Sequence, residues 1–231
     1  MVTHRTYTME EYVEFAERMN DFGNFERVNG EIVPVHGNDP VDDSLIEYVL
    51  RRDFDEKQIT THFDMPTREH DIIIADLIEL LILLGKTEFL RVYGQKTSVF
   101  IPSTGNAREP DVVIVNKKEE QRNASHQVLN PLVLIEVLSK STAAKDKSDK
   151  LEEYQTIDSL QEYVIVWQNT PKVVVYRKLQ ANRWEQEILA GLEHTAQLTS
   201  LNVSIPLKDI YENIGFAEPE NKQNDTPSPT I

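Results

Sequence analysis

The strongest constraint on the fold is the apolar run from Leu132 to Leu138, which carries one charged residue, Glu136. A run in which both alternating faces are apolar is typical of a β-strand that is covered on both sides. Strand alternation places Glu136 on the same face as Leu134 and Leu138. An ionised carboxylate there is costly unless it is paired, hydrogen-bonded or bound to a metal ion. The sequence therefore predicts a buried sheet with a carboxylate inside it.

Local signals predict helices and strands on both sides of this run. Capping residues and apolar spacings of three and four predict helices over residues 9–19, 43–52, 67–84 and 145–157. Asn29-Gly30 between two β-prone segments predicts a hairpin. Further strands are predicted at about residues 88–93, 96–102, 111–115, 162–167, 173–178 and 184–189. The pattern favours a fold of the α/β class with a mixed (α+β) sheet. Helices flank this central mixed sheet, and an N-terminal helix and hairpin come before the sheet in the sequence.

The length of 231 residues suits one such domain, which we assign to residues 1–216. Residues 36–66 are rich in Asp and Glu and are predicted to form an acidic surface insertion. Residues 217–231 are polar, contain three prolines and are predicted to be a disordered tail.

Composition excludes several classes of protein. The chain has no cysteine, which excludes disulfide scaffolds, thiol catalysis and cysteine-based zinc sites. No stretch approaches the ~20 apolar residues of a membrane helix, and the N-terminus lacks the apolar core of a signal peptide. We therefore expect a cytoplasmic protein without a membrane partner. The net charge of −15 argues against coating of nucleic acid by bulk electrostatics. The net charge does not exclude an enzyme that binds nucleic acid through a local surface patch and bound metal ions.

A second carboxylate accompanies Glu136. Asp111 follows Pro110 at the head of a predicted strand, where a turn or cap is the commoner role for Asp. The ordinary explanation for a buried Glu136 is likewise a satisfied partner such as Arg. Two carboxylates from different strands are also the oxygen ligands that a hard cation such as Mg²⁺ or Mn²⁺ prefers. Such an ion polarises a phosphate and lowers the pKa of an attacking water.

Phosphodiester hydrolysis also needs positive charge near the developing negative charge. The candidates that follow the Glu136 strand are Lys140, Lys145, Lys147 and Lys150. On a helix, Asp146, Lys150 and Tyr154 share one face, so a helix packed on this strand would bring Lys150 to Glu136. An ordinary solvated charged helix explains the same spacing.

Longer motifs connect these residues to a known family. The chain contains FERVNGEIV at 25–33, EVLSKST at 136–142 and DKSDKLEEY at 146–154. Together with Pro110-Asp111, these motifs resemble the Uma-type (Uma-two) family of proposed endonucleases in the PD-(D/E)XK superfamily. The resemblance extends over about residues 5–180. It implies a restriction-endonuclease-like core, and often a homodimer.

The resemblance also implies roles for individual residues. Asp111 and Glu136 match the metal-binding pair, and Lys150 matches a relocated active-site lysine. Glu31 matches an acidic residue that serves as an additional ligand or orients water, although a hairpin-edge surface Glu explains it equally. His70 matches a histidine at the start of the central helix, where it would touch a phosphate or the carboxylates, or make only local hydrogen bonds.

The chain departs from the family pattern at three places. Leu138 occupies the usual lysine position two residues after Glu136, so the charge must come from elsewhere. Lys140 replaces a proline usual in the family and is the rival to Lys150. The acidic segment 36–66 lengthens the path from the hairpin to the central helix, where it would cover the site mouth, form a dimer arm or contact a partner.

The leading hypothesis is a metal-dependent DNA endonuclease in which Mg²⁺ or Mn²⁺ on Asp111 and Glu136 activates a water. The first alternative is a catalytically silent nuclease fold that serves as a binding or interaction module, which the net charge and the acidic segment favour. A second alternative is a nuclease that acts on RNA or structured DNA. A homodimer is expected, because two symmetric subunits most simply cut two strands.

Overall fold

The structure is a computed structural model that describes residues 5–37, 39–63, 65–85, 88–138 and 146–216. The predictions of Lys140 and Lys145 as candidate lysines and of a disordered tail at 217–231 fall outside these ranges.

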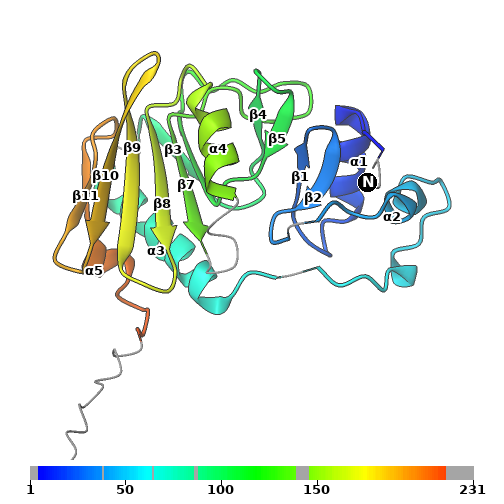
Figure 1. Ribbon diagram of the computed structural model, residues 1–231, viewed down its shortest axis with the longest axis horizontal. Helices are drawn as coiled ribbons and strands as arrows, with labels where there is room; N and C mark the ends of the chain where they lie inside the picture. Colours follow the sequence, from blue (N-terminus) through cyan, green and yellow to red (C-terminus); the bar gives the residue numbers. More distant parts are fainter. Residues whose placement is uncertain (1–4, 38, 64, 86–87, 139–145, 217–231) are drawn as a thin grey trace, which may run out of the picture.

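A six-stranded mixed sheet forms the centre of the molecule (Figure 1). Its strands, in spatial order, are β10 (Arg183–Ala190), β9 (Lys172–Gln180), β8 (Glu162–Trp167), β7 (Val133–Leu138), β6 (Val112–Asn116) and β3 (Leu90–Tyr93). Strands β7 and β8 are parallel and the other neighbours are antiparallel. Every residue of β7 is buried, as its continuous apolar run predicts. The predicted central mixed sheet is confirmed.

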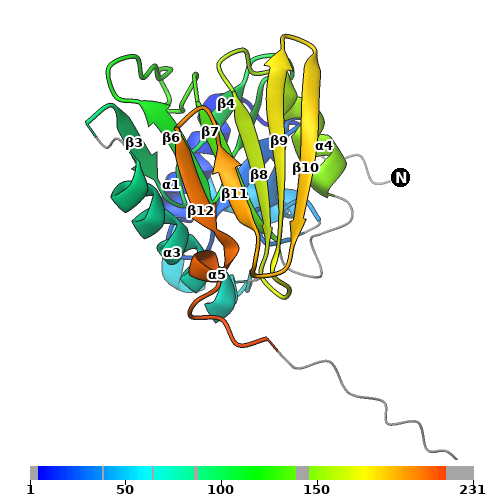
Figure 2. The same cartoon turned by 90° about the vertical axis from the view of Figure 1, so that its left-hand side faces the viewer.

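Both faces of this sheet are covered, and Figure 2 shows the strands side by side with β11 and β12 in front of them. One face packs against α3 (Arg68–Leu84), α5 (Leu207–Ile210) and the ribbon of β11 (Thr195–Leu198) and β12 (Val203–Pro206). The other face packs against α4 (Asp146–Gln155). Strand alternation divides β7 between the two cores: Ile135 and Val137 lie on the α3 side, and Leu134 and Leu138 lie on the α4 side.

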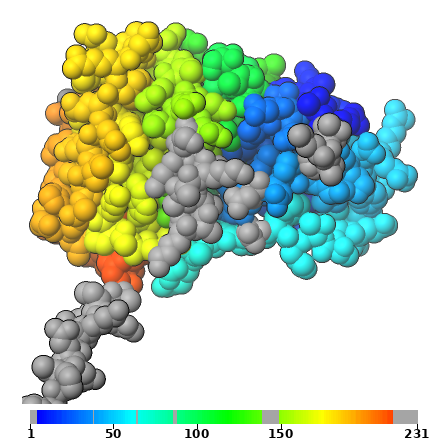
Figure 3. Space-filling view, viewed as in Figure 1, coloured from blue at the N-terminus to red at the C-terminus, as the bar shows by residue number. Residues whose placement is uncertain are grey.

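An N-terminal lobe, residues 5–63, lies beside this sheet along the long axis of the molecule (Figure 3). Its elements are α1 (Met9–Arg18), β1 (Phe25–Val28), β2 (Glu31–Pro34), α2 (Asp43–Val49) and the 3-10 helix η1 (Glu56–Gln58). Two strands from later in the chain, β5 (Asn106–Arg108) and β4 (Val99–Ile101), complete a small sheet of order β2-β1-β5-β4. The two parts of the molecule are therefore interleaved in sequence.

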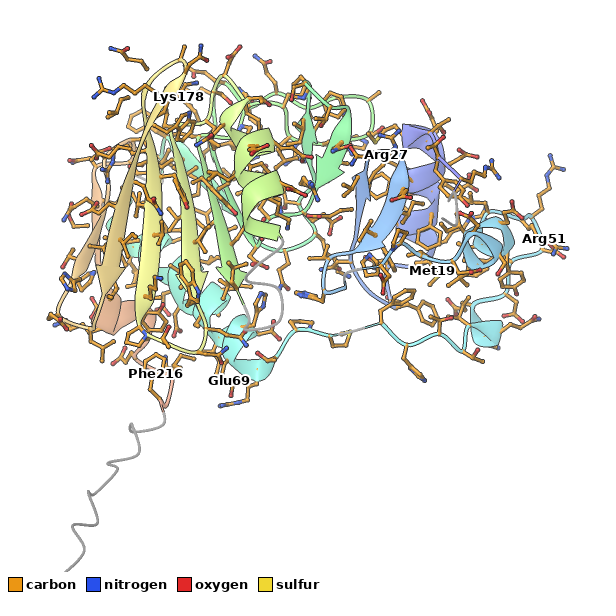
Figure 4. All side chains as sticks on the ribbon, in the orientation of Figure 1. Met19, Arg27, Arg51, Glu69, Lys178 and Phe216 are labelled. Atoms are coloured by element: carbon orange, nitrogen blue, oxygen red, sulfur yellow. The ribbon has the colours of Figure 1, made fainter. Side chains whose placement is uncertain are left out.

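The segment 36–66 is more than a surface insertion. Ile46 and Val49 of α2 are buried in the core of the N-terminal lobe, and Phe63 packs edge-on against Phe25 with ring centroids 5.1 Å apart. Most of the charged residues that the structure describes in this segment are exposed, and Arg51 points away from the rest of the chain (Figure 4). Much of this segment is thus a packed layer of the lobe.

The local signals set the helix ends as predicted. Thr8 and Glu11 form both halves of the capping box at the start of α1. Thr67 caps α3, and α3 ends at Gly85. Gly85 has extended backbone there, with φ −81°, and a Cβ on it would lie 2.5 Å from the carbonyl oxygen of Leu81. Close approach, rather than a left-handed conformation, explains this glycine.

No helix within the described ranges is long and apolar enough to cross a lipid bilayer.

Candidate active site

Asp111 and Glu136 lie next to each other where β6 meets β7. The antiparallel register pairs Val112 with Ile135, so the residues that follow this pair outward are Asp111 and Glu136. The backbone N–H of Val137 donates a hydrogen bond to Asp111 Oδ2 at 2.7 Å. Both acids are 4% exposed, so two carboxylates from adjacent strands are enclosed together.

Helix α4 supplies Lys150 to this pair. Lys150 is 5% exposed, and its Nζ lies 3.2 Å from Glu136 Oε1. One turn later, Tyr154 donates its hydroxyl hydrogen to the same oxygen at 3.0 Å. The predicted helical face of Lys150 and Tyr154 therefore packs on the Glu136 side of β7, where Leu138 is also found.

Glu26 of β1 is a third buried carboxylate in the cluster. Its Oε1 lies 3.2 Å from Lys150 Nζ and accepts a hydrogen bond from the backbone N–H of Glu109 at 2.8 Å. Its Oε2 lies 3.1 Å from Arg108, which also pairs with Glu153 of α4 at 2.7 Å. Glu26 therefore connects the small sheet to α4 through two cations.

A pair of histidines adjoins Asp111. His70, in the first turn of α3 near Glu69 (Figure 4), places its Nε2 3.4 Å from Asp111 Oδ2. Its ring packs edge-on against His36, with centroids 5.3 Å apart. Burial works to lower the pKa of His70, but Asp111 and Asp71 outweigh it and raise that pKa above its ordinary value. Burial and the neighbouring His70 lower the pKa of His36.

The balance of charge differs among the acids. Burial works to raise the pKa of Glu26, but Lys150 and Arg108 outweigh it and hold that pKa below its ordinary value. Burial raises the pKa of Glu136 to about 7, Asp111 and Glu26 add to the effect, and Lys150 opposes it. Between Glu26 and Glu136, Glu136 is therefore the carboxylate whose negative charge is less compensated by the protein alone.

This arrangement fits a divalent cation. Asp111 and Glu136 present two carboxylates in a buried place with excess negative charge, and a bound cation would relieve it. No group of three or more His, Asp or Glu side chains within the described residues is arranged to hold a metal ion. A two-carboxylate site leaves the other positions to water and substrate oxygens, as is usual for Mg²⁺.

The structure brings together most of the residues that the sequence predicts for the site. Asp111, Glu136 and Lys150 are in one buried cluster, and His70 contacts it. Glu31 is placed elsewhere: it pairs with Val28 at the turn end of the hairpin, and among the described residues no hydrogen bond or ion pair joins it to Asp111 or Glu136.

Sequence reasoning missed Glu26, which occupies the place expected for Glu31. Phe25 and Glu26 are adjacent and both buried, so both faces of β1 are covered. The available signal was that Glu26 falls within the same family-like segment, FERVNGEIV, and shares a face with Val28 and Glu31. The hairpin alone does not reveal that α4 covers this face.

The comparisons with known proteins identify the family of the chain. Residues 58–208 match the model of the Uma2 family, which is described as "Putative restriction endonuclease". The chain belongs to the Uma2 family.

Two relatives extend the comparison. The chain is 26% identical over 192 residues to the uncharacterized protein sll1609 of Synechocystis. The alignment covers 83% of this chain and 92% of that protein. The fold of this chain is similar to that of the crystal structure of "a putative nuclease belonging to DUF820" from Anabaena variabilis. That comparison has a TM-score of 0.57 at 15% sequence identity and covers 82% of this chain and 90% of the other. It supports the restriction-endonuclease-like fold.

Proposed function

We propose that this Uma2-family member is a metal-dependent endonuclease that hydrolyses phosphodiester bonds of DNA. The observation that carries the proposal is the buried Lys150, 3.2 Å from Glu136 and on the same side of β7 as the Asp111–Glu136 pair. An acid pair with an adjacent lysine supplies what phosphodiester hydrolysis needs: ligands for a divalent cation and a positive charge for the transition state.

Each side chain has a role in this proposal. Asp111 and Glu136 would hold Mg²⁺ or Mn²⁺, and such an ion, when bound, polarises the phosphate and lowers the pKa of an attacking water. Lys150 would stabilise the negative charge that develops on a non-bridging phosphate oxygen. Glu26 holds Lys150 in place, and His70 orients Asp111.

A catalytically silent nuclease fold that binds a partner is the second candidate. The net charge of −15 favours it, because a strongly acidic protein repels the nucleic-acid backbone. The cost of keeping three carboxylates buried together without a chemical role weighs against it.

The test is a cleavage panel with the purified protein at low salt. Supercoiled plasmid, linear duplex DNA, single-stranded DNA and RNA are each incubated with Mg²⁺, with Mn²⁺, or with EDTA. The proposal predicts metal-dependent nicking of plasmid that is abolished by EDTA and by Asp111→Asn, but kept by Glu152→Gln, an exposed acid on α4. Cleavage of RNA alone would reassign the substrate. The absence of cleavage on every substrate would favour the binding module.

A homodimer that presents two such sites to a duplex stays a prediction. Light scattering of the purified protein measures its mass directly.

A further inference from the structure

A cavity of about 640 Å³ lies next to the candidate active site and has no role in the chemistry described above. It lies between α3, the turn that connects α1 to β1, and the turn that connects β3 to β4. His36 lines it, and the His36 ring packs against His70, which contacts Asp111. The cavity is therefore separated from Asp111 by two imidazole rings, those of His36 and His70. Its size is within the range of about 300–1,000 Å³ that is common for small-ligand pockets.

The walls combine an apolar side with hydrogen-bonding groups. Ile74, Ala75 and Ile78 of α3 form the apolar side. Among the described residues, the Nε2 atoms of Gln95 and His36 are buried and have no hydrogen-bond partner. Such unsatisfied groups cost free energy, and a small rotation of either side chain toward a ligand in the cavity would relieve that cost.

The charges on the walls disfavour a phosphate in this cavity. Asp21 and Asp71 line it and would repel an anion. Lys96 is the cation among the lining residues, and its Nζ already donates to the backbone and side-chain oxygens of Asn20 at 3.0 and 2.9 Å. The ligand that suits these walls is uncharged and planar, with one apolar surface and an edge of donors and acceptors.

We propose that this cavity takes one unpaired nucleobase of the nucleic-acid strand whose backbone enters the candidate active site. The inference rests on the proposed function and adds to it a substrate class: a strand with a base that is unpaired or turned out of the stack. A base offers a flat ring for the α3 wall and edge groups for Gln95 and His36. Its strand keeps the phosphates outside the cavity, away from Asp21 and Asp71.

The test uses the full chain and a single-stranded oligodeoxynucleotide with one 2-aminopurine, in Ca²⁺ to limit cleavage. The fluorescence of 2-aminopurine reports binding. Ala75→Phe fills the cavity and is expected to weaken binding about tenfold or more. Gln95→Leu removes the donor and is expected to weaken it about fivefold to tenfold. Leu83→Phe, a matched change on an exposed part of the same helix, is expected to bind as the wild type does.

Each other outcome contradicts a defined part of the inference. No binding of the oligonucleotide, or equal binding by all variants, overturns the pocket. Binding of free 2-aminopurine riboside that is equally tight and equally sensitive to Ala75→Phe assigns the cavity to a free nucleoside and overturns the strand-bound base. Variant-sensitive oligonucleotide binding without any metal-dependent cleavage contradicts the nuclease function and leaves the pocket. Metal-dependent cleavage with variant-insensitive binding contradicts the pocket alone.

Discussion

Lys150 shares one ammonium group between two buried carboxylates, because its Nζ lies 3.2 Å from both Glu26 and Glu136. Removing that charge leaves two acids close together in a place that water barely reaches. Arg108 would still pair with Glu26, but a divalent cation would be the strong compensating charge left for Glu136. Lys150 therefore links the stability of the cluster to its affinity for metal.

Replacement of Lys150 by Met tests this link. We expect turnover of plasmid to fall about 100-fold or more, because the transition state loses its positive charge. We also expect Mn²⁺ to raise the melting temperature more in Lys150→Met than in the wild type. Lys57→Met, at an exposed lysine of η1, is the control for loss of a surface charge. Unchanged turnover in Lys150→Met would remove the lysine from the chemistry.

The raised pKa of Glu136 predicts how metal affinity depends on pH. The pKa is about 7, and the ligand is the carboxylate form. Protonation therefore competes with the metal as pH falls through 7. Calorimetry should find Mn²⁺ binding about tenfold weaker at about pH 6 than at about pH 8, with proton release on binding. An affinity that stays constant over this range would show that Glu136 is no ligand.

Individual residues differ in how far the sequence predicts them. Glu136 is conspicuous because it is the one charge in an apolar strand, whereas Lys150 follows from the family resemblance, with which its helical spacing is consistent. Glu26 is not conspicuous in the sequence. Its burial depends on Arg108 and Lys150, which are 82 and 124 positions away in the chain. Contacts of such long range leave no local pattern.

The hairpin of β1 and β2 is the element that carries Glu26 into the cluster, and its turn has a strict backbone requirement. Asn29 and Gly30 both have positive φ, 52° and 86°. A Cβ at Gly30 would lie 2.9 Å from the Cβ of Thr6. Gly30 is therefore needed for its conformation and for close packing.

Gly30→Ala should lower the free energy of unfolding by about 2–3 kcal/mol, because conformational strain and a steric overlap act together. Gly105→Ala is the matched control, since Gly105 has a φ of 71° with no atom within 4 Å of an added Cβ. We expect about 1 kcal/mol for it in urea unfolding. Equal losses for the two variants would contradict the contact with Thr6.

Elements with strong local signals are predicted well, and short paired strands are not. The helices α1, α3 and α4 follow from capping and spacing, and β8 has the predicted bounds. The prediction missed β5, β11, β12 and α5. Strand β5, Asn106–Arg108, has three residues of weak β propensity and becomes a strand because it pairs with β1 and β4.

At the scale of the whole molecule, ion pairs at the cluster join the N-terminal lobe to the large sheet. Arg108 is paired with Glu26 of the lobe and with Glu153 of α4. The side chains of Arg108 and Glu26 are both 5% exposed, and Glu153 is half-buried, so these ion pairs are largely shielded from water. The cluster therefore connects the N-terminal lobe to α4 on the large sheet, in addition to being a candidate active site.

Arg108→Leu should reduce the free energy of unfolding by about 3–5 kcal/mol, since the buried Glu26 loses one of its two cations and Glu153 loses its ion pair. Arg122→Leu is the control, because Arg122 pairs with Glu120 nearer the surface and should cost at most about 1 kcal/mol. Urea unfolding measures both. Similar losses for the two variants would mean that the ion pairs of Arg108 contribute little to the free energy of unfolding.

The large sheet and its order of strands could be anticipated only in outline. A buried β7 implies covering layers on both faces, which are present. The sequence does not reveal that β4 and β5 leave the large sheet to complete the small one, because that choice depends on the position of the hairpin. The packed state of segment 36–66 is hidden for the same reason, since the partners of its apolar residues lie in α1 and β1.

The most direct test of the account is cleavage of supercoiled plasmid by Glu136→Gln beside Glu152→Gln. Both changes remove one carboxylate charge and keep the side-chain shape, but Glu136 is buried in the cluster and Glu152 is exposed on α4. The account predicts that metal-dependent cleavage is lost in Glu136→Gln and kept in Glu152→Gln, with both variants folded. Full metal-dependent activity in a folded Glu136→Gln would contradict the assignment of this cluster as the active site.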